Sequence, residues 1–184
     1  RTVDGVAVPA TGTWVIDPSH TSAEFVARHL MVTKVRGGFR SVSGTIAVAE
    51  HPADSNVEVV IDTASVSTGD TDRDGHVKSA DFLDVENHPD MKFVSTAVRA
   101  NGSSWTLDGD LSIKGVTKPV SLEFDFVGLA TDPWGNQKAA FSAITTLNRE
   151  DWNLNWNVAL ETGGVLVSKK VDIEIEMQAV PANG

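Results

Sequence analysis

The amino-acid sequence predicts an all-β protein whose antiparallel strands close into a barrel. Apolar and polar residues alternate with a period of two along most of the chain, which is the pattern of strands with one buried face. Turn-forming pairs such as Asn101-Gly102 and Lys114-Gly115 separate the alternating stretches, so successive strands are joined by tight turns and run antiparallel. Small and aromatic residues share the faces expected to point inward, which favours a hollow interior.

About eight stretches show this alternation. A shift of one residue would exchange the two faces of any strand, so the assignment of faces depends on register. The residues expected to face inward are, in chain order, Ala23, Phe25 and Ala27; Val42, Gly44, Ile46 and Val48; Val57, Val59 and Ile61; Phe93, Ser95 and Ala97; Trp105, Leu107, Gly109, Leu111 and Ile113; Val120, Leu122, Phe124 and Phe126; Ala139, Phe141, Ala143, Thr145 and Leu147; and Val171, Ile173, Ile175 and Met177.

Two segments interrupt the strand pattern with helical character. In residues 70–81, Asp70 or Thr71 is suited to an N-cap, and the acidic residues that follow lie in the first turn, where the helix dipole favours negative charge. Residues 148–156 could form a second, shorter turn. The sequence therefore predicts a small helical insertion in a β protein.

The interior could be hollow or packed. A sandwich core needs large residues on both inner faces, whereas sets such as Ala139-Phe141-Ala143 mix small and large side chains. Strands of this kind, closed around one apolar ligand, leave unfilled volume. A tapered barrel filled by its own side chains is the alternative, and the pattern leaves both open.

Composition limits the function. The 184 residues are enough for one domain, and 41% hydrophobic with 22% charged residues is ordinary for a globular protein. The net charge of -10 opposes nucleic acid, which is not expected as a partner, and repels anionic membranes at long range. Because no run of about 18 apolar residues occurs, no stable membrane insertion through a spanning helix is expected.

No catalytic residue and no metal ligand is assigned. Asp70, Asp72, Asp74 and Asp81 have the spacing of a calcium-binding loop, but residues 57–66 before them are predicted to be a strand where an EF-hand needs a helix. The histidines show no ligand spacing. The absence of cysteine excludes disulfides, thiolate zinc sites and thiol nucleophiles.

Polar residues flanking strands are candidates for contact with a ligand's head group. His20 separates two strand segments, Arg73 and His76 lie in the helical insertion, and Arg149 follows the strand that ends at Leu147. At a barrel mouth, such side chains could hold a polar or phosphorylated group. Surface salt bridges and caps are the alternative for each of them.

Four motifs, in order, resemble those of the YceI-like family of bacterial lipocalin-like proteins, and the resemblance covers about residues 13–180. The motifs are Trp14-x-Ile16-Asp17-x-x-His20-Thr21-x-x-x-Phe25-x-x-x-His29; Ser65-Val66-x-Thr68-Gly69 with Arg73-Asp74-x-His76-Val77-x-Ser79-x-Asp81-Phe82-x-Asp84-Val85; His88-Pro89-x-Met91-Lys92-Phe93-x-Ser95-Thr96; and Leu111-Ser112-Ile113-Lys114-Gly115-Val116-Thr117-Lys118-Pro119-Val120. Trp152-Asn153 departs from the family's common Phe-Gly, a change that could narrow or reshape the end of the tunnel.

The resemblance implies an extended antiparallel eight-stranded lipocalin-like barrel with a short helical insertion around residues 70–83. Residues 1–12 are then an N-terminal extension, 13–180 the single barrel domain and 181–184 a C-terminal tail. The implied function is non-catalytic binding, storage or transport of a long-chain isoprenoid, a class that includes quinone-related chains, or of a similar fatty lipid in an interior tunnel. No cofactor other than this bound lipid is expected.

Two other functions stay open, as do the oligomeric state and the compartment. An enzyme could act on a lipid-like or quinone substrate in the same barrel, or a solid-cored barrel could be a stress-related interaction module. A homodimer is one open arrangement. The absence of an apolar signal segment in residues 1–13 favours the cytoplasm, whereas a processed N-terminus would fit the periplasm or export.

The tunnel lining follows from the alternation together with this resemblance. The residues predicted to line it are Phe25, Ala27, Phe39, Ile46, Ile61, Phe93, Leu111, Phe124, Phe126, Phe141, Trp152, Ile173 and Ile175.

Overall fold

The computed structural model describes residues 1–183, and strands dominate it. The helical elements are η1 (Pro18–His20), η2 (Pro52–Asp54), η3 (Thr63–Ser65), α1 (Thr71–Lys78) and η4 (Arg149–Trp152). The strands are β1 (Thr2–Val3), β2 (Val6–Ala7), β3 (Gly12–Ile16), β4 (Ser22–His29), β5 (Thr33–Phe39), β6 (Val42–Val48), β7 (Asn56–Asp62), β8 (Val66–Ser67), β9 (Asp90–Asn101), β10 (Ser104–Ile113), β11 (Val116–Thr131), β12 (Gln137–Asn148) and β13 (Lys170–Pro181).

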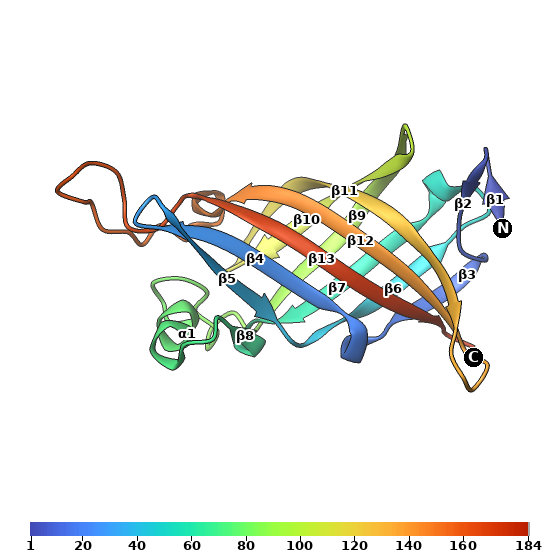
Figure 1. Ribbon diagram of the computed structural model, residues 1–184, viewed down its shortest axis with the longest axis horizontal. Coiled ribbons are helices and arrows are strands. Elements are labelled where there is room, and N and C mark those ends of the chain that lie inside the picture. The colour runs from blue at the N-terminus through green and yellow to red at the C-terminus, as the bar shows by residue number, and fades with distance from the viewer. Residues whose placement is uncertain (184) are drawn as a thin grey trace.

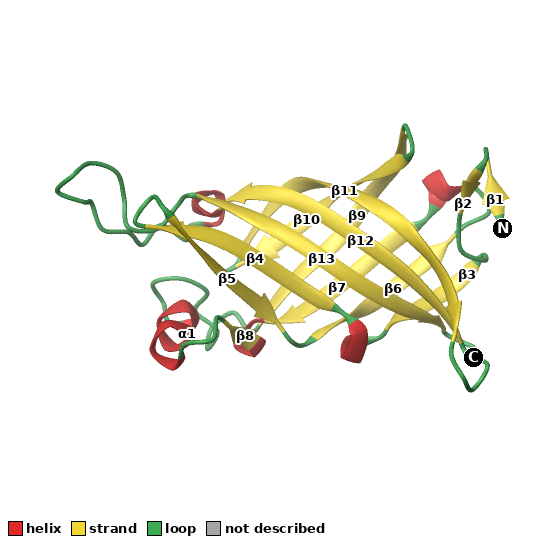
Figure 2. Cartoon of the chain, viewed as in Figure 1, coloured by secondary structure: helices red, strands yellow, loops and turns green. Residues whose placement is uncertain are grey.

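The strands close into an elongated eight-stranded antiparallel barrel (Figure 1; Figure 2). Closure comes from β13, which pairs with β12 along one edge and with β3 and β4 along the other. β3 and β4 are two halves of one path along the wall, interrupted by η1, and β5 and β6 form a second interrupted path. The predicted all-β fold is confirmed, and each predicted strand corresponds to a strand of the barrel wall.

A β-bulge corrects one predicted face. Asp108 of β10 lies opposite Ala97 of β9, but the next residue, Gly109, lies opposite Ser95. Thr96 is therefore an extra residue, and beyond it the inward and outward sides of β9 exchange. Val98, predicted to face outward, is 6% exposed and lines the interior, so the alternation predicted the wrong side for Ala97 and Val98.

The helical insertion begins as its sequence predicts. The Asp70 carboxylate accepts a hydrogen bond from the Arg73 backbone N–H at 2.9 Å, which makes it the N-cap of α1. η4 is the second helical segment, and the Trp152 indole N–H fixes it to the wall by donating to the Leu111 carbonyl at 2.9 Å. Both segments lie at the same end of the barrel, with the β4–β5 turn and residues 153–169 (Figure 1). We call this end the mouth.

The chain's N-terminal residues lie at the opposite end, which we call the closed end (Figure 1). The Arg1 side chain donates hydrogen bonds to the Ala49 and Glu50 carbonyls, which tie the β1–β2 hairpin to the chain after β6. Val8 is consequently 5% exposed. Among residues 1–183, none of the helical elements has the length and hydropathy of a membrane-spanning segment.

Candidate functional site: an apolar cavity along the barrel

The barrel encloses a cavity of about 520 Å³. At the closed end it is lined by Val8, Pro9 and Pro52, and at the mouth it reaches the exposed residues Arg28 and His29. Its length follows the barrel, and its volume lies within the range of sites that bind small molecules. The interior is therefore hollow, unlike that of a barrel packed solid by its own side chains.

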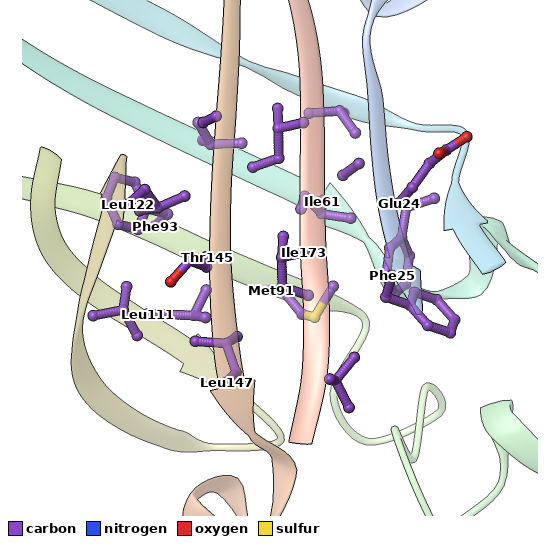
Figure 3. Close-up of a pocket in the computed structure, with 18 of the residues that line it drawn as sticks. Glu24, Phe25, Ile61, Met91, Phe93, Leu111, Leu122, Thr145, Leu147 and Ile173 are labelled. Carbon is purple, nitrogen blue, oxygen red and sulfur yellow. The ribbon is translucent and has the colours of Figure 1, made fainter. Parts of the chain in front are cut away.

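Every residue predicted to line the tunnel lines this cavity. Figure 3 shows several of them with their neighbours, among them Phe25, Ile61, Phe93, Leu111 and Ile173. The complete predicted set that lines it is Phe25, Ala27, Phe39, Ile46, Ile61, Phe93, Leu111, Phe124, Phe126, Phe141, Trp152, Ile173 and Ile175.

Glycines in the wall explain why aromatic side chains leave the cavity open. The Phe93 ring lies over Gly109 of the neighbouring strand, so close that a Cβ at Gly109 would overlap the ring. Phe25 lies over Gly37 of β5 in the same way. Each ring covers a glycine on the wall, a known partnership in sheets, and therefore does not extend across the lumen.

Ionisable side chains line the cavity at the mouth. They include Arg28 and His29 of β4, Arg73 and His76 of α1, and Arg149 of η4. Elements far apart in sequence thus bring basic groups together at one end of a chain whose net charge is -10. The closed end is lined by apolar side chains instead, so the cavity has a direction.

Arg149 is occupied by the protein's own backbone. Its guanidinium donates to the carbonyls of Leu154 and Trp156 at 2.5 and 2.9 Å, and to those of Ser168 and Val167 at 2.8 and 3.3 Å. Burial lowers the pKa of Arg149, since desolvation disfavours its charge. Arg149 therefore positions the two arms of the 153–169 segment at the mouth.

Arg73 and His76 join α1 to the mouth. The Arg73 guanidinium donates to the Thr68 hydroxyl and carbonyl, both at 2.8 Å. The His76 ring lies 2.9 Å from an Asp81 carboxylate oxygen. It also packs edge-on against Phe82 and Trp156, with ring centroids 5.0 and 4.5 Å away. This aromatic contact links α1 to the 153–169 segment.

His20 lies apart from the cavity, in a surface depression beside η1 and β5. Its ring is held 2.9 Å from the Asp17 carboxylate. Hydrogen bonds from Ser19 and His20 lower the pKa of Asp17 to about 2. The structure thus separates His20 from Arg73, His76 and Arg149, because the η1 turn between β3 and β4 carries it on the outer surface.

Sequence reasoning missed several cavity residues. Leu154, Trp156, Leu166 and Val167 line the mouth from an irregular segment with no alternation to show which side faces in. Val8 lines the closed end from outside the predicted domain. The only sequence signal at these positions is that the residues are apolar, since the surrounding chain has no alternation that would show which side chains face the cavity.

Three of the four aspartates with calcium-loop spacing, Asp70, Asp74 and Asp81, have other partners. Asp70 caps α1, and the Asp74 carboxylate accepts from the Thr68 hydroxyl at 2.6 Å, which is the main reason its pKa is lowered. Among residues 1–183, no group of three or more histidine, aspartate or glutamate side chains is arranged to hold a metal ion.

The fold and the cavity define a lipocalin-like barrel with an apolar interior site. The chain belongs to the YceI-like family, whose domain model matches residues 14–179. It is 38% identical over 151 residues to a UPF0312 protein of Pectobacterium atrosepticum, covering 82% of this chain and 79% of the relative.

Solved structures share the fold. The YceI protein of Campylobacter jejuni is 27% identical, with a TM-score of 0.70 over 83% of this chain and 88% of that one. A polyisoprenoid binding domain from Saccharophagus degradans is 15% identical, with a TM-score of 0.68 over 91% and 98% of the two chains.

Proposed function

We propose that this protein binds a long-chain isoprenoid or a similar apolar lipid in the barrel and stores or transports it. The observation that carries the proposal is the cavity itself: about 520 Å³, elongated, and walled almost entirely by apolar side chains. The description of the Saccharophagus degradans domain as polyisoprenoid binding supports the same ligand class.

The energetics of such a ligand come from burial. Each buried CH₂ contributes about 0.8 kcal/mol, so a five-carbon isoprene unit contributes up to about 4 kcal/mol. Ordering and association costs remove a large part of this gain. A few units are still enough for micromolar binding, about -8 kcal/mol, without a specific polar contact.

The ends of the cavity suggest how the ligand is oriented. The apolar closed end, with Val8 and Pro9, suits the end of a hydrocarbon tail. The mouth, with Arg28, His29 and Arg73, suits a polar or anionic head group. Arg149 acts indirectly in this scheme, because its donors already serve backbone carbonyls.

The proposal assigns no catalytic residue. The ionisable groups that reach the cavity at α1 and η4 are engaged in hydrogen bonds within the protein. Membership of the YceI-like family and the resemblance to a polyisoprenoid binding domain support a binding protein.

Lipid extraction and thermal unfolding test the proposal together. The protein is purified without detergent, extracted with organic solvent and analysed by mass spectrometry for apolar compounds. Delipidated protein is then heated with prenyl alcohols of increasing length. We expect a co-purified lipid and a melting temperature that rises with chain length up to a limit. An empty extract together with an unchanged melting temperature for every alcohol would overturn the proposal.

A further inference from the structure

The β4–β5 turn at the mouth exposes three consecutive apolar side chains. Leu30, Met31 and Val32 are 48%, 55% and 75% exposed. A folded chain gains nothing from apolar surface left in water, and adjoining exposed apolar residues commonly mark sites of interaction. These three adjoining side chains are therefore a candidate interaction surface.

The backbone of this turn makes the apolar residues more unusual. The Val32 N–H donates to the His29 carbonyl at 3.1 Å, so Leu30 and Met31 occupy the two central positions of a β-turn. Both have positive φ, 53° and 65°, the conformation for which asparagine and glycine are strongly preferred in hairpins. Two large apolar residues occupy left-handed positions here without being buried.

The turn is continuous with the mouth of the cavity. The Leu30 N–H donates to the Leu166 carbonyl, and the Leu166 N–H donates to the Val158 carbonyl, both at 2.9 Å. Met31 packs against Gly164 of the same segment. Val158 is 47% exposed, and Leu166 lines the cavity. We call Leu30, Met31, Val32 and Val158 the apolar tip.

Basic residues surround the base of the tip. Arg28 and Lys34 are paired across the β4–β5 hairpin, and Lys169 and Lys170 lie at the start of the neighbouring β13. Lys169 has an ion pair with Glu150 at 3.5 Å, whereas Arg28, Lys34 and Lys170 form none within residues 1–183. Three acidic residues belong to the same end: Glu161 in the projecting loop, and Glu150 and Asp151 in η4, of which Glu150 is the partner of Lys169.

An apolar surface ringed by cations complements an anionic bilayer. The remaining negative charge is screened beyond about 10 Å at ordinary ionic strength, so the local cations decide the contact once the tip is close. In Figure 1 the 153–169 segment and the β4–β5 turn project from the mouth end of the barrel.

We propose that the apolar tip docks on the surface of an anionic lipid bilayer. Docking places the mouth against the membrane, so that a lipid tail passes between bilayer and cavity without crossing water. The role of this docking in lipid transfer rests on the proposed function, whereas the contact between the apolar tip and the bilayer does not depend on it. The barrel stays outside the bilayer, and the tip alone enters the interface.

Vesicle flotation tests the docking. The probe vesicles contain phosphatidylethanolamine and phosphatidylglycerol, with pure phosphatidylcholine vesicles for comparison. The test variant is Leu30→Asn with Met31→Gly, which removes two apolar side chains and supplies the residues that the turn prefers. It is therefore expected to fold at least as stably as the parent.

The control variant is Trp134→Ser, which removes an 83% exposed apolar side chain from the β11–β12 turn at the closed end (Figure 1). We expect the parent and Trp134→Ser to float equally with anionic vesicles and more weakly with neutral ones. Because the double variant loses the burial of two large side chains, its partition coefficient should fall about 30-fold.

Prenyl alcohol binding without vesicles separates the two proposals. All three proteins should bind it equally, because the tip lies outside the cavity. A parent that binds the alcohol but not anionic vesicles would overturn docking and leave the proposed function standing. Tip-dependent flotation without alcohol binding would do the reverse. A double variant that floats like the parent but converts a dimer to a monomer would show that a second copy of the chain covers the tip, which also overturns docking.

Discussion

Ala143 provides a way to shorten the cavity from within. It lies on β12 between Phe124 and Ile175, facing the lumen about midway along the wall. Ala143→Trp would place an indole across the lumen and separate the mouth from the deep half of the cavity lined by Phe126 and Met177. Because the new side chain enters open space, the free energy of unfolding should change by no more than about 1–3 kcal/mol.

The expected effect depends on the length of the ligand. After ordering costs, each isoprene unit excluded from the deep half lowers the binding free energy by roughly 2 kcal/mol, about half of its burial gain. That value corresponds to about a 30-fold rise in Kd per unit. Short prenyl alcohols, which end before Ala143, should bind as they do to the parent protein.

Isothermal titration with prenyl alcohols of increasing length measures this profile. Ile144→Trp is the matched control, because Ile144 is the next residue, faces outward and is 54% exposed. The parent and Ile144→Trp should gain affinity up to the same chain length, whereas Ala143→Trp should stop gaining earlier. Identical profiles for all three proteins would refute an interior tail site that runs the length of the barrel.

Three further outcomes concern the frame of the site. Arg149→Ala leaves backbone carbonyls without donors and should lower the free energy of unfolding, measured by urea titration, by about 3 kcal/mol. Arg149→Lys should not restore the lost stability, since an ammonium lacks the guanidinium fork. Because the Asp17 pKa of about 2 lies below the usual aspartate value of 3.8, its carboxylate stabilises the fold above about pH 4 and loses this effect toward pH 2. Asp17→Asn should therefore flatten acid unfolding curves in that window. Gly109→Ala should lower the melting temperature, because its Cβ would meet the Phe93 ring and lie 2.7 Å from the Val94 carbonyl oxygen; an unchanged melting temperature would contradict the close approach.

The lining was predictable wherever alternation continues without interruption. Along β12 and β13, residues such as Phe141 and Ile173 are placed by a period of two that any strand imposes on its side chains. The same rule misplaced Ala97 and Val98, because Thr96 adds a residue that only pairing with β10 reveals. A bulge of this kind has no signal in the alternation itself.

For the polar residues at the mouth, the structure decided more than the sequence did. The sequence showed that Arg149 follows a strand. Only the structure showed that its guanidinium donates to four backbone carbonyls. In the sequence, His20 and His76 are both histidines in polar segments that flank strands, yet the η1 turn places His20 outside the cavity. Contacts between residues distant in sequence decide what a polar side chain does.

By itself, the sequence determined the β class, the faces of the strands wherever no bulge intervenes, and the start of α1 at Asp70 or Thr71, because each depends on residues a few positions apart. The tertiary structure alone decided that the barrel is hollow, with aromatic rings lying over Gly37 and Gly109. It also decided that the 153–169 segment and the β4–β5 turn meet at one mouth. Volume and proximity arise only when distant strands pair, and no local pattern encodes the space between them.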